Sequence, residues 1–171
     1  GAVCGACLKA RPHFDATHAR YRYTFPLDRL VQALKYRHCL AVSRFLADSL
    51  LEALPEHVAD ADLMLALPLS ERRLAERGFN QALEIARPLA RRHGIPLLAT
   101  GYVKSLDTAP QASLPWKERQ KNIRGAFECA LDLSGKRVIV IDDVMTTGAT
   151  LNEFARTLKK HGAARVSNWV V

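Results

Sequence analysis

The sequence predicts an α/β fold, in which helices flank a mostly parallel sheet. Short apolar runs alternate along the chain with segments whose apolar residues recur at helical spacing, an order typical of parallel-sheet proteins. One run, residues 138–141, is apolar at four consecutive positions, as in strands that are covered on both faces. The length of 171 residues fits a single domain.

The first 54 residues divide into three parts. Residues 1–20 contain cysteines and histidines without a sustained apolar period, so we expect an irregular segment there. A short strand is expected over residues 21–25. Residues 27–54 have helical spacing that Pro55 ends, which predicts one or two helices.

The remaining residues alternate more regularly between strands and helices. Residues 104–125 are polar and exceed the roughly 12 to 15 residues of an ordinary loop, so we expect a functional or mobile segment there. Strands are expected at 62–67, 95–103, 127–133, 137–141 and 165–171, and helices at 80–93 and 151–161.

The composition limits the functions that the chain can have. Its 25 Lys and Arg against 17 Asp and Glu give a net charge of +8, which suits anionic ligands or nucleic acid and also serves solubility. With 49% hydrophobic and 25% charged residues, the chain is not disordered, collagen-like or a coiled coil. No apolar run approaches the roughly 20 residues of a membrane span, and the first residues lack a secretory pattern. We therefore expect a cytoplasmic protein without membrane insertion.

Residues 138–150 contain the strongest functional motif. Asp142 and Asp143 follow the apolar strand, at the edge where open α/β sheets bind ligands. Residues 146–150 (TTGAT) then lead into a helix with hydroxyls, a glycine and backbone N–H groups, which suit a phosphate monoester. Carboxylates for sugar hydroxyls beside a phosphate cradle predict a ribose 5-phosphate site.

This motif also fits two other interpretations. A capped turn with an incidental acidic pair is the interpretation without function. A nucleoside triphosphatase would need a G-x-x-x-x-G-K-[ST] loop. The chain lacks this loop, because Gly135 and Lys136 are followed by Arg137 and preceded five residues earlier by Ala130.

The sequence IDDVMTTGAT at 141–150 resembles the signature of type I phosphoribosyltransferases, which bind 5-phosphoribosyl 1-pyrophosphate (PRPP). Further stretches resemble the ComF/GntX group of that family: LKY at 34–36, ERGFNQA at 76–82, Gln111, and Arg119 with Asn122 before GAF at 125–127. The resemblance implies a type I phosphoribosyltransferase fold with a flexible hood and a small Cys-bearing N-terminal segment. It divides the chain into a partial zinc-ribbon-like segment, 1–20, and a phosphoribosyltransferase-like domain, 21–171.

The resemblance also implies roles for particular residues. Asp142 and Asp143 would hold the ribose 2′ and 3′ hydroxyls, and the 5-phosphate would lie against Thr146, Thr147, Gly148, Ala149 and Thr150. The resemblance also places Ser70, Arg72, Arg73 and Arg77 at the pyrophosphate. The guanidinium groups of the three arginines suit phosphate oxygens, although each arginine also fits a solvated position. For Lys35 and Tyr36, the resemblance is the only indication of a functional role.

Residues 104–125, called the hood segment below, resemble the closing hood of these enzymes. Lys117 and Arg119 lie on it, and a closing lid can exclude water and bring cations to a leaving pyrophosphate. We expect Asp142, Asp143 and Arg119 to be catalytic and Lys117 to bind substrate. A disordered basic loop is the alternative interpretation of this segment.

The implied reaction is displacement of pyrophosphate from C1 of PRPP by a nitrogen nucleophile, with Mg²⁺ bridging ribose hydroxyls and pyrophosphate oxygens. The sequence contains no clear general base and no group of residues that marks a nucleobase-binding site. It therefore does not identify the acceptor.

The alternative function is a non-catalytic adaptor or single-stranded DNA-binding protein that works with a competence helicase, since the ComF group is associated with natural competence. The arginines at 87, 91 and 92 favour nucleic-acid contact, whereas only 7% aromatic residues argue against a stacking platform.

Cys4 and Cys7 have the spacing of zinc ligands, but a closed zinc site needs four ligands. The resemblance implies two such pairs, and this sequence contains the second. His13 and His18 could complete a set, although the gap after Cys7 is shorter than a zinc finger normally needs. We expect Cys4 and Cys7 to bind zinc in the full-length protein. A redox role is disfavoured because the pair does not lie at a βα turn.

Overall fold

The computed structural model describes residues 5, 8, 11–53, 60–106 and 123–171. Its main sheet has the strand order β1-β7-β6-β2-β3, and all neighbouring strands are parallel. The strands are β1 (Ala16–Ala19), β2 (Leu63–Ala66), β3 (Leu97–Leu98), β6 (Arg137–Asp142) and β7 (Arg165–Val170). The predicted mostly parallel sheet with flanking helices is therefore confirmed.

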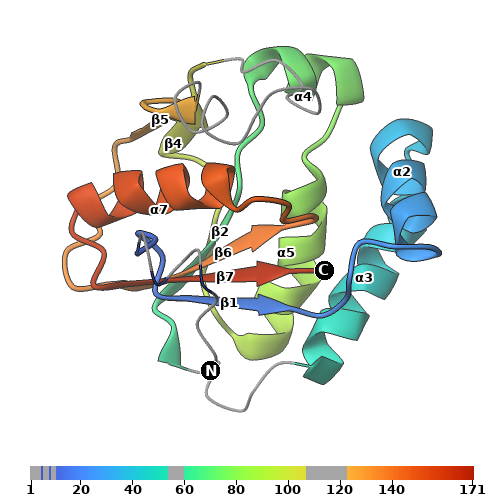
Figure 1. Ribbon diagram of the computed structural model, residues 1–171, viewed down its shortest axis with the longest axis horizontal. Coiled ribbons are helices and arrows are strands. Elements are labelled where there is room, and N and C mark those ends of the chain that lie inside the picture. Colours follow the sequence, from blue (N-terminus) through green and yellow to red (C-terminus); the bar gives the residue numbers. More distant parts are fainter. Residues whose placement is uncertain (1–4, 6–7, 9–10, 54–59, 107–122) are drawn as a thin grey trace.

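Helices cover both faces of this sheet. The chain runs from β2 through α5 (Gln81–His93) to β3, and from β6 through α7 (Ala149–Lys160) to β7. Because these two crossovers leave the neighbouring strands β2 and β6 in opposite directions, right-handed connections place their helices on opposite faces. Figure 1 shows α5 behind the strands and α7 on their other side. Val138–Ile141 are accordingly buried throughout.

Two more helices precede β2. They are α2 (Leu27–Arg37) and α3 (Leu40–Ala53), and α3 packs against α5, as Figure 1 shows at the right of the molecule. Leu34 of α2 and Leu46 and Leu50 of α3 are at most 1% exposed and belong to the same core as the sheet. None of the helices in the described part of the chain is long and apolar enough to cross a membrane.

A second, two-stranded sheet holds the two ends of the hood segment together. Its antiparallel strands are β4 (Tyr102–Lys104) and β5 (Phe127–Cys129). The Tyr102 hydroxyl donates to the Leu98 carbonyl at 2.9 Å and accepts from the Ala66 N–H at 3.1 Å. Burial raises the pKa of Tyr102 to about 12. This side chain therefore fastens the base of the hood segment to β2.

The structure corrects several local predictions. Residues 16–19, expected to be irregular, form the edge strand β1, and residues 21–25 form no strand. Residues 71–77 form the unexpected helix α4 (Glu71–Arg77). The single strand expected over 95–103 is divided between β3 and β4, which belong to different sheets.

The Tyr102 contacts predict a measurable loss of stability. Tyr102→Phe removes the hydroxyl and leaves the buried Ala66 N–H without its acceptor, which we expect to lower the free energy of unfolding by about 1–3 kcal/mol. Urea denaturation of the variant measures this loss. Tyr23→Phe, at a residue that is 45% exposed, is the matched control and should lie within about 0.5 kcal/mol of the parent. Equal stability of all three proteins would contradict the assigned role.

Candidate functional site

A cavity of about 200 Å³ lies where the carboxyl ends of β2 and β6 meet. Ligands of open α/β sheets bind at such a point, because the chain leaves the two strands in opposite directions and a crevice opens between the loops. Most of the predicted site residues line this cavity: Ser70, Arg73, Arg77, Asp142, Asp143, Thr146, Thr147, Gly148, Ala149 and Thr150.

The remaining predicted residues are not in this group. Arg72 lines a neighbouring depression, and its guanidinium lies 2.7 Å from Glu76 on an exposed part of α4. Arg119, Lys117, Cys4 and Cys7 fall outside the described residues. Among the residues that are described, no group of three or more His, Cys, Asp or Glu could hold a metal ion.

The two carboxylates lie next to one another at the end of β6. Consecutive strand residues point to opposite faces, so both can serve one ligand only where the strand ends. Here the Asp142 carboxylate accepts from the Asp143 N–H at 2.9 Å, and both residues line the cavity. Asp143 is only 7% exposed, and its Oδ2 lies 2.8 Å from Lys35 Nζ.

The electrostatics of this pair are unfavourable without a ligand. Burial raises the pKa of Asp142 well above its usual value, and the negative charge of Asp143 raises it further. The ammonium of Lys35 acts in the opposite direction. The pair, with Asp143 buried and Asp142 half-buried, is thus an acceptor site in which hydroxyl donors or a cation would be stabilised.

The loop after the carboxylates forms the start of α7. Gly148 has φ +74° and precedes the first helical residue, a conformation that L side chains rarely adopt. A Cβ there would also lie 2.5 Å from Met145 Cε. The first turn of this fully described helix contains no acidic residue, so no carboxylate of that turn opposes an anion at the N-terminus.

Four cationic side chains line the same cavity, from three different elements. They are Lys35 of α2, Arg73 and Arg77 of α4, and Lys104 of β4. The acidic residues in the described lining are Asp142 and Asp143. The cations outnumber them, so the cavity favours an anionic ligand.

Gln81 offers a further donor to this cavity. It is 2% exposed, and its Oε1 accepts from Arg77 at 2.9 Å. Its buried Nε2 has no hydrogen-bond partner within the described part of the chain. Buried polar groups are usually paired, so this amide is suited to a bound ligand.

Sequence reasoning missed Gln81, Lys104 and Lys35 as cavity residues. Next to Gln81, Asn80 caps the start of α5 by accepting from the N–H groups of Ala82 and Leu83. The Asn80 amide also donates to the Leu67 carbonyl at 3.0 Å and so fixes α5 to the loop after β2. The LKY resemblance was the one signal for Lys35.

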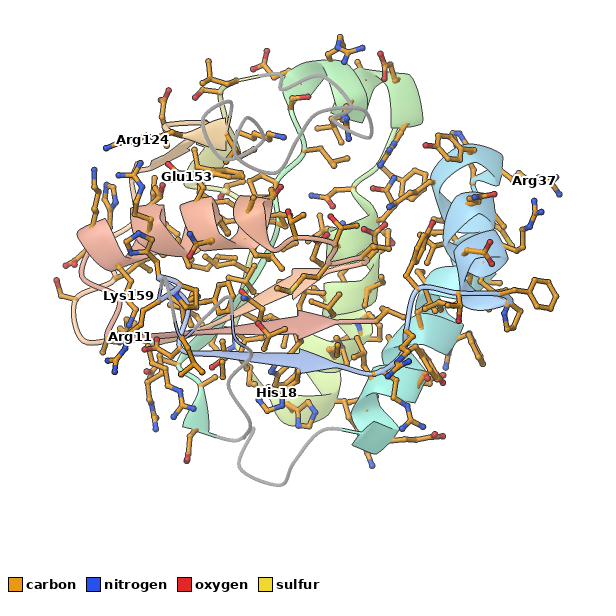
Figure 2. The ribbon with its side chains drawn as sticks, in the orientation of Figure 1. Arg11, His18, Arg37, Arg124, Glu153 and Lys159 are labelled. Carbon is orange, nitrogen blue, oxygen red and sulfur yellow. The ribbon has the colours of Figure 1, made fainter. Side chains whose placement is uncertain are left out.

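Helix α7 also fixes the far end of the hood segment. Glu153 is 6% exposed, accepts from the Gly125 N–H at 2.7 Å and pairs with Arg156. Burial raises the pKa of Glu153, but the hydrogen bonds from Arg156 and Gly125 outweigh this and lower it overall. Figure 2 shows Glu153 on α7 below the segment that contains Arg124. Helix α7, which begins at the predicted phosphate cradle of residues 146–150, therefore also anchors the hood segment.

Comparisons with known proteins agree with this arrangement. Residues 80–171 match the family model described as phosphoribosyl transferase domain. DNA utilization protein YhgH of Salmonella typhi is 33% identical over 171 residues, covering 97% of this chain and 75% of that protein. Competence protein F of Haemophilus influenzae is 33% identical over 174 residues, covering 97% of this chain and 76% of that protein.

A solved structure of purine phosphoribosyltransferase from Pyrococcus horikoshii is 18% identical, with a TM-score of 0.39, and the match covers 91% of this chain and 85% of that one. The family match includes α5, both carboxylates and the whole cradle. The chain belongs to the phosphoribosyl transferase domain family and, within it, to the ComF/GntX group that includes competence protein F and YhgH.

Proposed function

We propose that the cavity binds PRPP and that the chain is a phosphoribosyltransferase acting on a nitrogen acceptor. One observation carries the proposal: a single cavity combines two adjacent carboxylates, a helix N-terminus and the guanidinium groups of Arg73 and Arg77. A ribose diol, a phosphate monoester and a pyrophosphate are the groups that these three features would recognise.

The acid pair supports the ribose part of this proposal. Asp142 and Asp143 would each accept a hydrogen bond from one ribose hydroxyl, and such bonds to ionised acceptors are stronger than neutral ones. The diol would also supply the donors that the buried carboxylates need. Sugar binding therefore lowers the electrostatic penalty at the end of β6.

The cradle and the cations support the two phosphate positions. The 5-phosphate would accept from N–H groups at residues 148–150 and from threonine hydroxyls, with Gly148 letting the backbone turn toward it. The pyrophosphate would lie toward Arg73 and Arg77, whose guanidinium groups can bind two oxygens each. Lys117 and Arg119 of the hood segment would complete this shell.

The proposed reaction breaks the bond from C1 to the pyrophosphate oxygen and forms a bond from C1 to the acceptor nitrogen. Pyrophosphate leaves with the electron pair, and the acceptor nitrogen gives up its proton to water. Asp142 and Asp143 would hold Mg²⁺ near the ribose, and the bound cation would supply positive charge that neutralises the leaving group. The oxygen-rich donor set around the acid pair fits this hard cation. The chain's own residues orient the ribose and stabilise the departing charge.

Single-stranded DNA binding, with or without a helicase partner, is a second candidate. Two relatives are named for competence and for DNA utilization. The exposed arginines at 87, 91 and 92 lie within α5 or its last turn, in a chain of net charge +8. Such a group would bind phosphates without reading sequence. Zinc at Cys4 and Cys7 and a cytoplasmic location remain predictions.

The central proposal predicts loss of PRPP binding when one carboxylate is neutralised. Calorimetric titration of the whole chain should give saturable binding of Mg-PRPP, and Asp143→Asn should weaken it by about 10-fold or more, since a hydrogen bond to a charged group contributes about 1.5–3 kcal/mol. Asp48→Asn, at an exposed position of α3, is the matched control. Equal affinity in Asp143→Asn, or no binding by the parent chain, would contradict the proposal.

Asp142 should show a conflict between stability and binding. Its pKa is raised in the folded state, so it is ionised more easily in the unfolded chain, and stability declines as pH rises above the usual carboxyl pKa of 3.8. Asp142→Asn removes this decline while Asn can still accept from the Asp143 N–H. We expect stability about 1 kcal/mol higher at pH 7, together with weaker PRPP binding.

Denaturation of parent and variant between pH 4 and pH 7 measures this effect, and their difference should grow with pH. A variant that is destabilised by the same amount at every pH would refute the electrostatic explanation.

The second candidate predicts salt-sensitive DNA binding through α5. Changing the arginines at 87, 91 and 92 to Ala should weaken binding of an oligo(dT) strand and reduce the slope of log affinity against log salt by about 2, since each lost phosphate contact reduces it by about 0.7. A control with Arg22, Arg29 and Arg44 changed to Ala loses the same charge elsewhere. Equal losses in both variants, or no binding at low salt, would exclude α5 as the interface.

A further inference from the structure

Helix α2 reaches the cavity although it lies outside the 80–171 family match. Lys35 Nζ is 2.8 Å from Asp143 Oδ2, and the two side chains are 20% and 9% exposed. Exposed ion pairs contribute little to stability, whereas removing one member of a buried pair leaves an uncompensated charge. The Lys35–Asp143 pair is closer to the buried case.

The position of Lys35 is fixed by the packing of its helix. Val31 and Leu34, one turn and one residue earlier, are fully buried and anchor α2 in the core. The helix ends at His38, which has φ +54° and donates its N–H to the Ala33 carbonyl. Lys35 therefore projects from a helix end with a defined geometry.

The end of α2 also contacts residues before α5. The Arg77 guanidinium lies 5.7 Å from the centroid of the Tyr36 ring, and the His38 and Phe79 rings are 5.5 Å apart. Arg77 in turn donates to Gln81. Lys35, Tyr36 and His38 thus brace both the carboxylate side and the arginine side of the cavity.

We propose that Lys35 is a positioning residue for the ribose-binding acid pair: it orients the Asp143 carboxylate and supplies the positive charge that allows two adjacent carboxylates to face a ribose diol. This inference rests on the proposed PRPP site. It assigns to α2 a part of the site that the family match does not contain.

Electrostatics support this role. Lys35 forms an ion pair with Asp143, and Asp142 is subject to the charges of both Asp143 and Lys35. The other described cations of the cavity, Arg73, Arg77 and Lys104, belong to α4 and β4. At the Lys35–Asp143 distance an ion pair is strong when water is largely excluded. Without the ammonium, the two carboxylates repel one another and Asp143 loses the contact that holds its side chain.

A double-mutant cycle tests whether Lys35 acts through Asp143. In the full chain, Lys35→Met should weaken Mg-PRPP binding about 10-fold, and Lys35→Arg should recover most of the loss. In the Asp143→Asn background, Lys35→Met should have almost no additional effect, since coupled residues are not additive. Inorganic phosphate, which offers no diol, should bind the parent and Lys35→Met equally. Lys160→Met, at an exposed position of α7, is the control.

The outcomes separate this inference from the proposed function. If Asp143→Asn loses PRPP and Lys35→Met does not, the positioning role is wrong while the PRPP site stands. If Lys35→Met weakens PRPP binding as much in the Asp143→Asn background as in the parent, and also weakens phosphate binding, Lys35 is a direct phosphate ligand. That result would overturn the inference. If the parent binds no PRPP, both proposals fail. Should Lys35→Met not fold, Lys35→Gln, which keeps a donor without the charge, takes its place in the cycle.

Discussion

Two crossovers leave the neighbouring strands β2 and β6 in opposite directions, and the rest of the architecture depends on this arrangement. It places α5 and α7 on opposite faces of the sheet, so the middle of β6 must be apolar at every position. It also separates the loops that follow the two strands, and the cavity forms between them. The carboxylates, the cradle and the arginines of α4 meet there because each follows one of these two strands.

The site is assembled from groups that destabilise the unliganded protein. Two carboxylates lie side by side with limited access to water, and the buried Gln81 amide nitrogen has no hydrogen-bond partner among the described residues. Lys35, the Asn80 cap and the Tyr102 hydroxyl hold the surrounding segments in place. A ligand with hydroxyls and phosphates would satisfy the same groups, which is why the arrangement is understandable as a binding site but not as a contribution to folding.

The parts that could be predicted from sequence are those whose residues are contiguous. Strand β6, the carboxylates and the cradle lie in one stretch of thirteen residues, 138–150, with a clear apolar pattern followed by turn residues. Strand β1 could not be predicted, because residues 16–19 have no alternation and are ordered by pairing with β7. Helix α4 buries no residue and so has no apolar stripe to recognise. The contact of Lys35 with Asp143 joins distant parts of the chain, so local patterns contain no trace of it.

The central claim is that a ribose 5-phosphate group is held at the end of β6. A crystal structure of the chain with Mg-PRPP tests it most directly. The claim predicts the 5-phosphate within hydrogen-bonding distance of the backbone N–H groups at residues 148–150, with the ribose hydroxyls on Asp142 and Asp143. A saturated crystal with the ligand bound elsewhere, or with its ribose turned away from the two carboxylates, would contradict it.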